Sequence, residues 1–108
     1  MQKIRILLLK LGIRSNLKGF HFLLYALQLC LESEDYLLSV YKTLYVDVAE
    51  HFGTSRDNVA HCMRTAISSC WNKGNRKLLH QLAGYELAQR PANGEFIDIL
   101  YNCLLQEG

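Results

Sequence analysis

The chain has 108 residues, half of them apolar and a fifth charged, a balance that favours one globular domain over residues 1–108. Its formal charge of +2 does not by itself indicate a nucleic-acid partner, and a single proline with few alternating stretches favours an all-α class. The most apolar run, residues 20–31, is shorter than the roughly 20 residues of a bilayer span, and residues 1–11 lack a signal-peptide cleavage site. We therefore expect a cytoplasmic protein without a membrane partner.

The charges are unevenly distributed along the chain. Residues 1–18 contain five basic side chains and no acid, and a second basic group lies between residues 56 and 77. Acids gather at residues 32–35 and again toward the C-terminus. This asymmetry suits a protein with one phosphate-facing side, although an ordinary solvated surface explains it as well.

The hydrophobic pattern predicts a compact bundle of about six to seven helices. In chain order, the expected helices span residues 2–11, 19–33, 34–41, 45–52, 55–73, 76–82 and 93 onward. The second is apolar on nearly every side, which predicts a central position in the fold. The short third helix is expected to direct Leu37, Leu38 and Tyr41 inward, and Asn93 is expected to cap the last helix.

Residues 45–73 have the pattern of a helix-turn-helix. Gly53 marks the end of the first helix, since glycine enters the left-handed conformation there at no steric cost. Ala49 is expected where the two helices approach each other, and Thr54 is expected to cap the second helix, with Asp57 completing a capping box. Any two amphipathic helices would share these features, and we prefer the DNA-binding interpretation.

The second of these helices has two contrasting faces. Apolar residues at three-and-four spacing predict a buried stripe of Val59, Cys62, Met63, Ala66, Ile67, Cys70 and Trp71. The opposite face is polar, and in a helix-turn-helix its N-terminal half enters the major groove of DNA. The residues expected on this part of the outward face are Arg56, Ala60, His61 and Arg64. A solvated helix face is the alternative.

The sequence offers neither a metal site nor catalytic machinery. Its four cysteines lack the close paired spacing of zinc ligands, so we expect buried free thiols and no metal or cofactor. Ser68 faces outward and Cys70 inward on one helix, which gives no nucleophile–base pair. A glycine-rich phosphate loop does not occur either. We therefore expect neither an enzyme nor a small-molecule substrate.

Several stretches together resemble a known family. They are Lys18-Gly19-Phe20, Leu44 to Ala49 with Phe52, then Val59, Arg64, Ala66-Ile67, Trp71, Gly74-Asn75, Pro91, Asn93 and Glu95-Phe96-Ile97. In order and spacing they resemble the DNA-binding effector domain of stage-zero sporulation protein A, the response-regulator family that starts endospore formation in Gram-positive bacteria. The resemblance covers essentially the whole chain. It implies a winged-helix-like effector domain without a wing, which binds promoter DNA and often self-associates there in tandem copies.

The chain departs from that family at several positions. The family recognises bases with a glutamate and two arginines, and the matching positions hold Ala60, His61 and Arg64, so one arginine is retained. Val46 stands where the family has a proline that presets the start of the helix. The family's receiver domain has no counterpart in this sequence, which is either one domain of a longer regulator or a relative without phosphorylation control.

The leading hypothesis is sequence-specific binding of double-stranded promoter DNA in transcription control. Arg64 would take a guanine edge, with His61, Ala60 and Arg56 as the other residues facing the bases. Phosphate contacts are expected from Thr54, Ser55, Lys73, Arg76 and Lys77. The alternative is a helical protein-interaction module that keeps the fold and has lost base recognition, which the replacements at Ala60 and His61 motivate.

Overall fold

The computed structural model describes residues 2–107, so the two ends of the expected domain, Met1 and Gly108, lie outside the described residues. The elements are α1 (Gln2–Lys10), α2 (Lys18–Glu32), the 3-10 helix η1 (Glu34–Leu38), the π-helix η2 (Val40–Leu44), α3 (Tyr45–Phe52), α4 (Arg56–Lys73), α5 (Arg76–Ala83) and α6 (Asn93–Glu107). No strand occurs within residues 2–107. The prediction of an all-α bundle of six to seven helices is confirmed.

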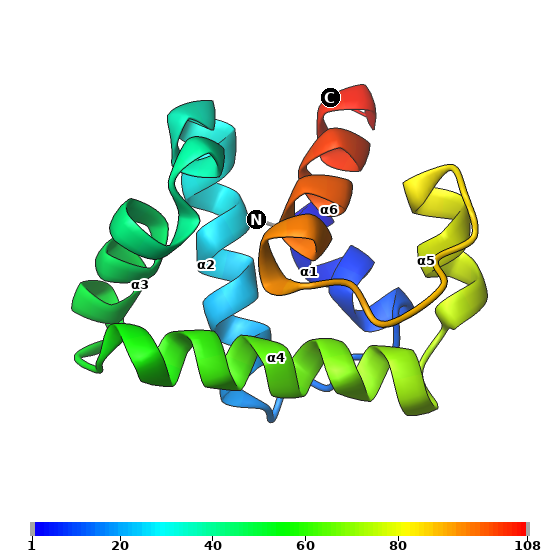
Figure 1. The fold of residues 1–108 in the computed structure, drawn as a ribbon, viewed down its shortest axis with the longest axis horizontal. Helices are drawn as coiled ribbons and strands as arrows, with labels where there is room; N and C mark the ends of the chain where they lie inside the picture. Colours follow the sequence, from blue (N-terminus) through cyan, green and yellow to red (C-terminus); the bar gives the residue numbers. More distant parts are fainter. Residues whose placement is uncertain (1, 108) are drawn as a thin grey trace.

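The longest helix, α4, lies along one edge of the molecule, and the other helices stand on it (Figure 1). In this view α3 stands at the N-terminal end of α4 and α5 at its C-terminal end, with α2 and α6 between them. The C-terminus lies at the opposite side of the molecule from α4. None of the helices in the described range is both long and apolar enough to cross a membrane.

The centre of the core is α2, as its sequence predicted. Eight of its 15 residues are buried, and α2 packs against α1, α3, α4 and α6. Phe20, Leu23 and Leu27 are completely inaccessible to solvent. A helix with apolar residues on nearly every side needs several neighbours to cover it, and α2 has them.

Two glycines bring backbone segments into direct contact around α4. A Cβ atom on Gly19 would lie 2.1 Å from the Cys62 carbonyl oxygen, so α2 crosses α4 with no room for a side chain. A Cβ atom on Gly74 would lie 2.4 Å from the Leu11 carbonyl oxygen, and that oxygen accepts a hydrogen bond from Asn75 N–H at 3.0 Å. These contacts fix α4 against the rest of the molecule at its middle and at its C-terminal end.

The segment between α2 and α3 differs from the short α-helix predicted over residues 34–41. It forms η1 and η2, which are separated at Ser39, whose backbone (φ −151°, ψ 67°) is not helical. Leu38 is 84% exposed and Tyr41 48% exposed, so the prediction that both point inward is wrong, while Leu37 is half-buried. The break at Ser39 changes the helical phase, and Leu44 takes the completely buried position in this segment instead.

The cap of α4 lies one residue later than predicted. Ser55, not Thr54, is the N-cap, and its hydroxyl accepts a hydrogen bond from Asn58 N–H at 3.1 Å. The Thr54 hydroxyl accepts instead from the Asn58 side-chain amide at 2.9 Å. Asp57 does not complete a capping box, because with Ser55 as the N-cap it is the second helical residue and not the third. Its carboxylate accepts a hydrogen bond from the Tyr41 hydroxyl at 3.0 Å. Both hydroxyls nevertheless stabilise the start of α4.

Candidate nucleic-acid interface

The turn between α3 and α4 has the geometry of a glycine-terminated helix. Gly53 has φ 66° and ψ 40°, in the left-handed region that favours glycine. Gly53 N–H donates to the Glu50 carbonyl (3.3 Å) and Thr54 N–H to the Ala49 carbonyl (2.9 Å). Ala49 is 5% exposed, which agrees with a small residue where the two helices meet. This turn fixes the angle at which α4 leaves α3.

The inward face of α4 is apolar and completely buried. Its five fully inaccessible residues are Val59, Met63, Ala66, Ile67 and Cys70. The predicted stripe is confirmed at these positions, whereas Cys62 and Trp71 are only half-buried at its borders. Each of these two lies about 90° around the helix from the centre of the stripe, given 3.6 residues per turn. The buried stripe therefore leaves nearly half of the helix surface to solvent.

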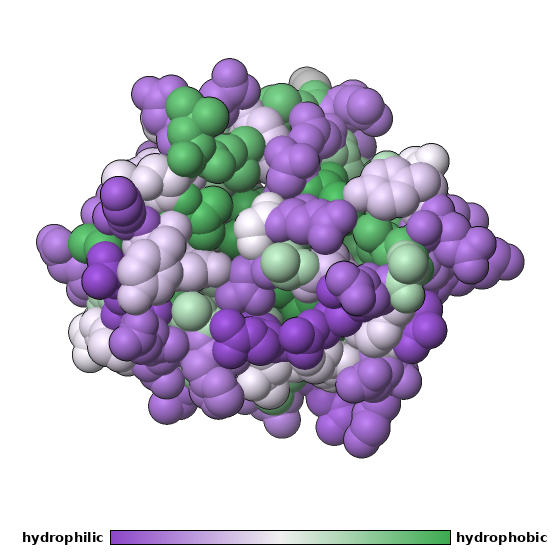
Figure 2. Space-filling model, viewed as in Figure 1, coloured by the Kyte–Doolittle hydropathy of each residue, from purple (hydrophilic) through white to green (hydrophobic). Residues whose placement is uncertain are grey.

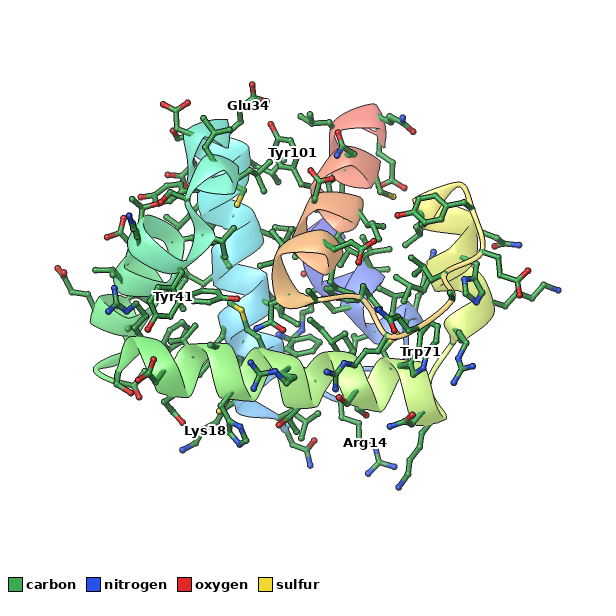
Figure 3. All side chains as sticks on the ribbon, in the orientation of Figure 1. Arg14, Lys18, Glu34, Tyr41, Trp71 and Tyr101 are labelled. Atoms are coloured by element: carbon green, nitrogen blue, oxygen red, sulfur yellow. The ribbon has the colours of Figure 1, made fainter. Side chains whose placement is uncertain are left out.

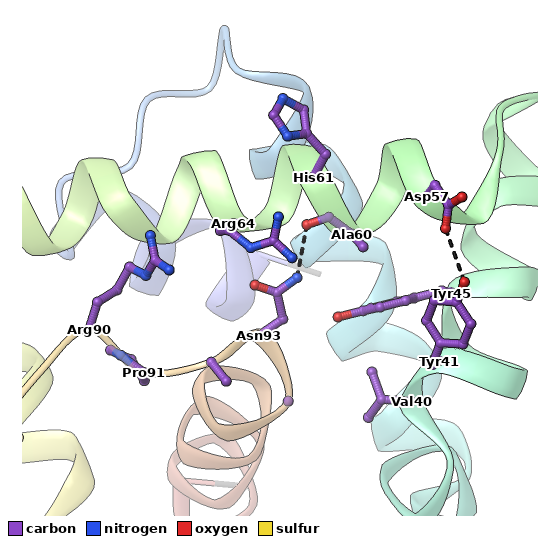
Figure 4. Close-up of a pocket in the computed structure, with 12 residues that line it drawn as sticks. Val40, Tyr41, Tyr45, Asp57, Ala60, His61, Arg64, Arg90, Pro91 and Asn93 are labelled. Atoms are coloured by element: carbon purple, nitrogen blue, oxygen red, sulfur yellow. Dashed lines mark hydrogen bonds between the residues drawn. The ribbon is translucent and has the colours of Figure 1, made fainter.

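The side chains predicted to face DNA bases do not all point the same way. His61 and Arg64 are both exposed, but Arg64 points toward the start of α6 while His61 points away from it (Figure 4). Ala60 is half-buried, and its carbonyl oxygen accepts a hydrogen bond from the Asn93 side chain at 2.9 Å. Arg56 lies at the N-terminal end of α4, with its guanidinium carbon 4.2 Å from the centre of the Tyr41 ring.

Asn93 has a different role from the predicted cap. It is the first residue of α6, and its side chain donates across the interface to α4 rather than to its own helix. The neighbouring Tyr45 side chain is buried, and this burial raises the pKa of its hydroxyl, although the Asn93 side chain and the charge of Arg64 act in the opposite direction. The Asn93 contact fixes the start of α6 against the middle of α4.

An open hollow of about 620 Å³ lies between α4, η2 and the start of α6 (Figure 4). Its wall combines apolar side chains such as Val40 with two arginines, Arg64 and Arg90. Arg90 lies in the irregular connection before α6, and its Nη1 donates to the Ser68 hydroxyl at 2.7 Å. Sequence analysis missed Arg90, because no periodic pattern relates this connection to α4.

The predicted phosphate contacts fall into two groups at opposite ends of α4. Thr54 and Ser55 precede its first turn, whereas Lys73 ends the helix and Lys77 lies in the first turn of α5. An 18-residue helix is about 27 Å long, so the two groups are far apart compared with the roughly 12 Å width of the major groove. Both lysines are exposed.

The predicted phosphate contact Arg76 is already engaged within the protein. Its guanidinium donates twice to the Trp71 carbonyl oxygen, at 2.9 and 2.8 Å, and lies 4.0 Å from the centre of the Trp71 ring. His80 packs edge-on against the same ring. These contacts order the C-terminal end of α4 and leave Arg76 less adaptable than Lys73 or Lys77.

The surface over α4 is polar, whereas the upper part of the molecule combines polar side chains with an apolar patch. In Figure 2 a band of strongly hydrophilic atoms crosses the lower half of the face, over α4 and the connection before α6, while an apolar patch lies over η1.

Within residues 2–107 no cluster of three or more histidine, cysteine or acidic side chains could hold a metal ion. Burial raises the pKa of the Cys30 and Cys70 thiols to about 11.

A polar face on the helix that follows a glycine turn, with the buried side of that helix packed on the core, is the arrangement found in helix-turn-helix DNA-binding domains. The family model described as the sporulation initiation factor Spo0A C terminal matches residues 4–104. The chain belongs to this family of DNA-binding effector domains of response regulators. The resemblance found from the sequence is thereby confirmed.

Proposed function

We propose that this domain binds promoter DNA by sequence, with the N-terminal half of α4 in the major groove and Arg64 as its main base contact. The observation that carries the proposal is the combination of an exposed Arg64 with a helix backbone fixed by the Gly19 and Asn93 contacts. A rigid backbone fixes the position of the Arg64 Cα atom and the direction in which its side chain leaves the helix. An arginine held in this way suits the two acceptors of a guanine edge.

The residues around Arg64 lead us to expect weaker base discrimination than in relatives with a complete set of polar contacts. Ala60 brings no polar side-chain group to the groove, and its half-buried position directs it toward the hollow. His61 is exposed on the outermost face, where it is suited to contact a base or a phosphate. Arg56 packs on Tyr41, and that stacking limits how far it can reach.

Phosphate contacts are proposed at both ends of α4. At the N-terminal end, Thr54, Ser55 and the first backbone amides of the helix favour an anion, because these N–H groups lack carbonyl partners within the helix. At the C-terminal end, the exposed Lys73 and Lys77 are suited to a more distant phosphate, with Arg76 in a smaller role because its guanidinium is engaged. With this function we propose a cytoplasmic location and binding in tandem copies, as the resemblance to the family implies.

A second candidate function is a helical protein-interaction module that keeps the fold without base recognition. Two observations favour it: the apolar Ala60 at a base-facing position, and Leu38, which is 84% exposed at the far side of the fold. An exposed apolar side chain is available for contact with a partner protein, although single exposed apolar residues also occur on ordinary surfaces.

Selection of bound duplexes from a random pool tests the proposed function. We expect enrichment of one short motif containing a guanine, and tighter binding of the selected duplex than of a scrambled one in fluorescence anisotropy. The affinity should fall steeply with salt, because lysine and arginine side chains displace counterions from phosphates. If no duplex is bound at low salt, DNA binding fails and the interaction module takes its place. If all duplexes bind equally tightly, the proposal that the domain recognises bases is wrong.

A further inference from the structure

We propose that two segments outside the helix-turn-helix flank α4 and contact the phosphates on opposite sides of the groove that α4 enters. The first is the connection of residues 84–92, through Arg90. The second is the link of residues 11–17 with the start of α2, through Arg14 and Lys18. This inference rests on the proposed function and adds three DNA-contacting side chains to it.

The first flank is tied to α4 at two points. Arg90 donates to the Ser68 hydroxyl at 2.7 Å, and Asn93, just beyond the connection, donates to the Ala60 carbonyl oxygen at 2.9 Å. Pro91 between them is buried. Arg90 therefore has a fixed attachment beside α4 and lines the same hollow as Arg64, while the residue as a whole stays exposed. Figure 4 shows both arginines on this side of the helix.

The second flank runs along α4 on another side. One end is held at the C-terminal end of α4, where Asn75 N–H donates to the Leu11 carbonyl oxygen at 3.0 Å. The other end is held at the middle of α4, where Gly19 packs on the Cys62 carbonyl. Arg14 and Lys18 lie between these anchors, and both are exposed. Figure 3 shows both at the edge formed by α4, Lys18 beside its N-terminal half and Arg14 beside its C-terminal half.

The helical positions of these attachments place the two flanks on different sides of the outward face. With 3.6 residues per turn, Ala60, whose carbonyl holds the first flank, and Cys62, whose carbonyl holds the second, lie about 160° apart around the helix. The exposed Arg64, His61 and Thr65 lie on the outward arc between these two positions. A helix about 10 Å wide fills a major groove about 12 Å wide, so cations on its two flanks meet the two phosphate strands.

The surrounding charges favour phosphate over a solvated surface for these cations. Asp57 is the acid on the exposed face of α4, and its carboxylate accepts a hydrogen bond from Tyr41. Glu34 lies at the opposite end of the molecule, where it accepts from the Tyr101 hydroxyl at 2.9 Å (Figure 3), whereas Glu86 lies in the first flank itself. Across the two flanks the three cations, Arg90, Arg14 and Lys18, outnumber this one acid, and this excess of positive charge favours a polyanion.

Phosphate ethylation interference on the selected duplex tests the inference. Wild type should show blocked binding at phosphates on both strands beside the groove. Arg90→Ala should lose the interference on one strand, Lys18→Ala on the other, and each should lower the slope of log affinity against log salt by about 1. Ser68→Ala should partly reproduce Arg90→Ala because it releases the guanidinium, and Arg90→Lys should keep the slope.

The matched control is Lys3→Ala, because Lys3 is an exposed cation that lines a different hollow together with Glu107, near the C-terminus. The Lys3→Ala variant should have the same slope of log affinity against log salt, and the same interference pattern, as wild type. If Arg90→Ala and Lys18→Ala keep the wild-type pattern while Arg64→Ala loses base preference, the flanking contacts are wrong and the proposed function stands. If both variants lose interference at the same phosphates, the proposal that the two flanks contact opposite strands is wrong. If wild type binds no duplex, both proposals fail together.

Discussion

The inward and outward faces of α4 differ in polarity and burial, and we expect them to serve different functions. The inward face is wholly apolar, and α2 approaches it so closely that Gly19 touches the Cys62 carbonyl. The outward face is polar, and Arg64, His61 and Thr65 are exposed. One helix therefore carries both the stability of the fold and the candidate recognition surface. Substitutions on the inward face should change folding, whereas those on the outward face should change binding alone.

Met63→Ala on the inward face should have the largest effect. Met63 is completely buried, and removing most of its side chain leaves a cavity behind α4. We expect the free energy of unfolding to fall by about 2–5 kcal/mol, measured by urea denaturation. Since a domain of this size has about 5–15 kcal/mol in total, part of the variant would be unfolded. A loss below about 0.5 kcal/mol would contradict close packing of this face.

Gly19→Ala should have the next largest effect, because an added Cβ would overlap backbone atoms of α4. Overpacking of this kind typically costs about 1–3 kcal/mol, and thermal unfolding should show it. Gly94→Ala is the matched control: Gly94 is also the second residue of a helix, but the nearest atom to its added Cβ would lie 3.9 Å away. Equal stability of the two variants would show that α2 and α4 do not touch at Gly19.

Arg64→Ala should leave the unfolding transition unchanged and weaken binding of the best duplex by about 1–3 kcal/mol. The preference at one base pair should relax, because the guanidinium that contacts it is gone. Thr65→Ala, one position further along the same helix, is a suitable control because its hydroxyl bonds to the His61 carbonyl of its own helix. A larger loss of DNA affinity for Thr65→Ala than for Arg64→Ala would contradict the assignment of Arg64 as the main base contact.

The smallest effect should come from the buried thiol of Cys70 on the inward face. Burial raises its pKa from 9.0 to about 11, so the folded state holds this proton more tightly than the unfolded state. The contribution of this group to the free energy of unfolding is complete well below pH 9 and is lost progressively as the pH rises from about 9 through 11. Between pH 7 and pH 9 we expect a loss of about 0.4 kcal/mol from this group. Urea denaturation under reducing conditions should show a weaker pH dependence in Cys70→Ala.

The parts of the structure that sequence analysis predicted depend on local rules. The buried positions of α4, such as Val59 and Ile67, follow from the period of the helix. Gly53 follows from the backbone conformation that ends a helix, and it is found in that conformation. Family resemblance predicted the DNA-binding class, because its residues run along the whole chain.

The parts that were missed depend on contacts between distant segments. Leu38 and Tyr41 fit an inward helical pattern, yet the break at Ser39 turns both toward solvent. Nothing local shows that Asn93 bonds to α4 instead of capping α6, or that Arg90 reaches Ser68. The candidate site was therefore predicted on α4 and the segments next to it in sequence, whereas the contacts of residues 84–92 with α4 became visible only in three dimensions.

Chemical-shift mapping of the ¹⁵N-labelled protein on the selected duplex tests most directly whether the outward face of α4 is the surface that meets DNA. We expect the largest amide shifts over residues 54–68, with further shifts around Lys18 and Arg90. Amides of η1 and the last turns of α6, at the opposite end of the molecule, should change little. Shifts concentrated around Glu34 and Leu38, with residues 54–68 unchanged, would contradict the assignment.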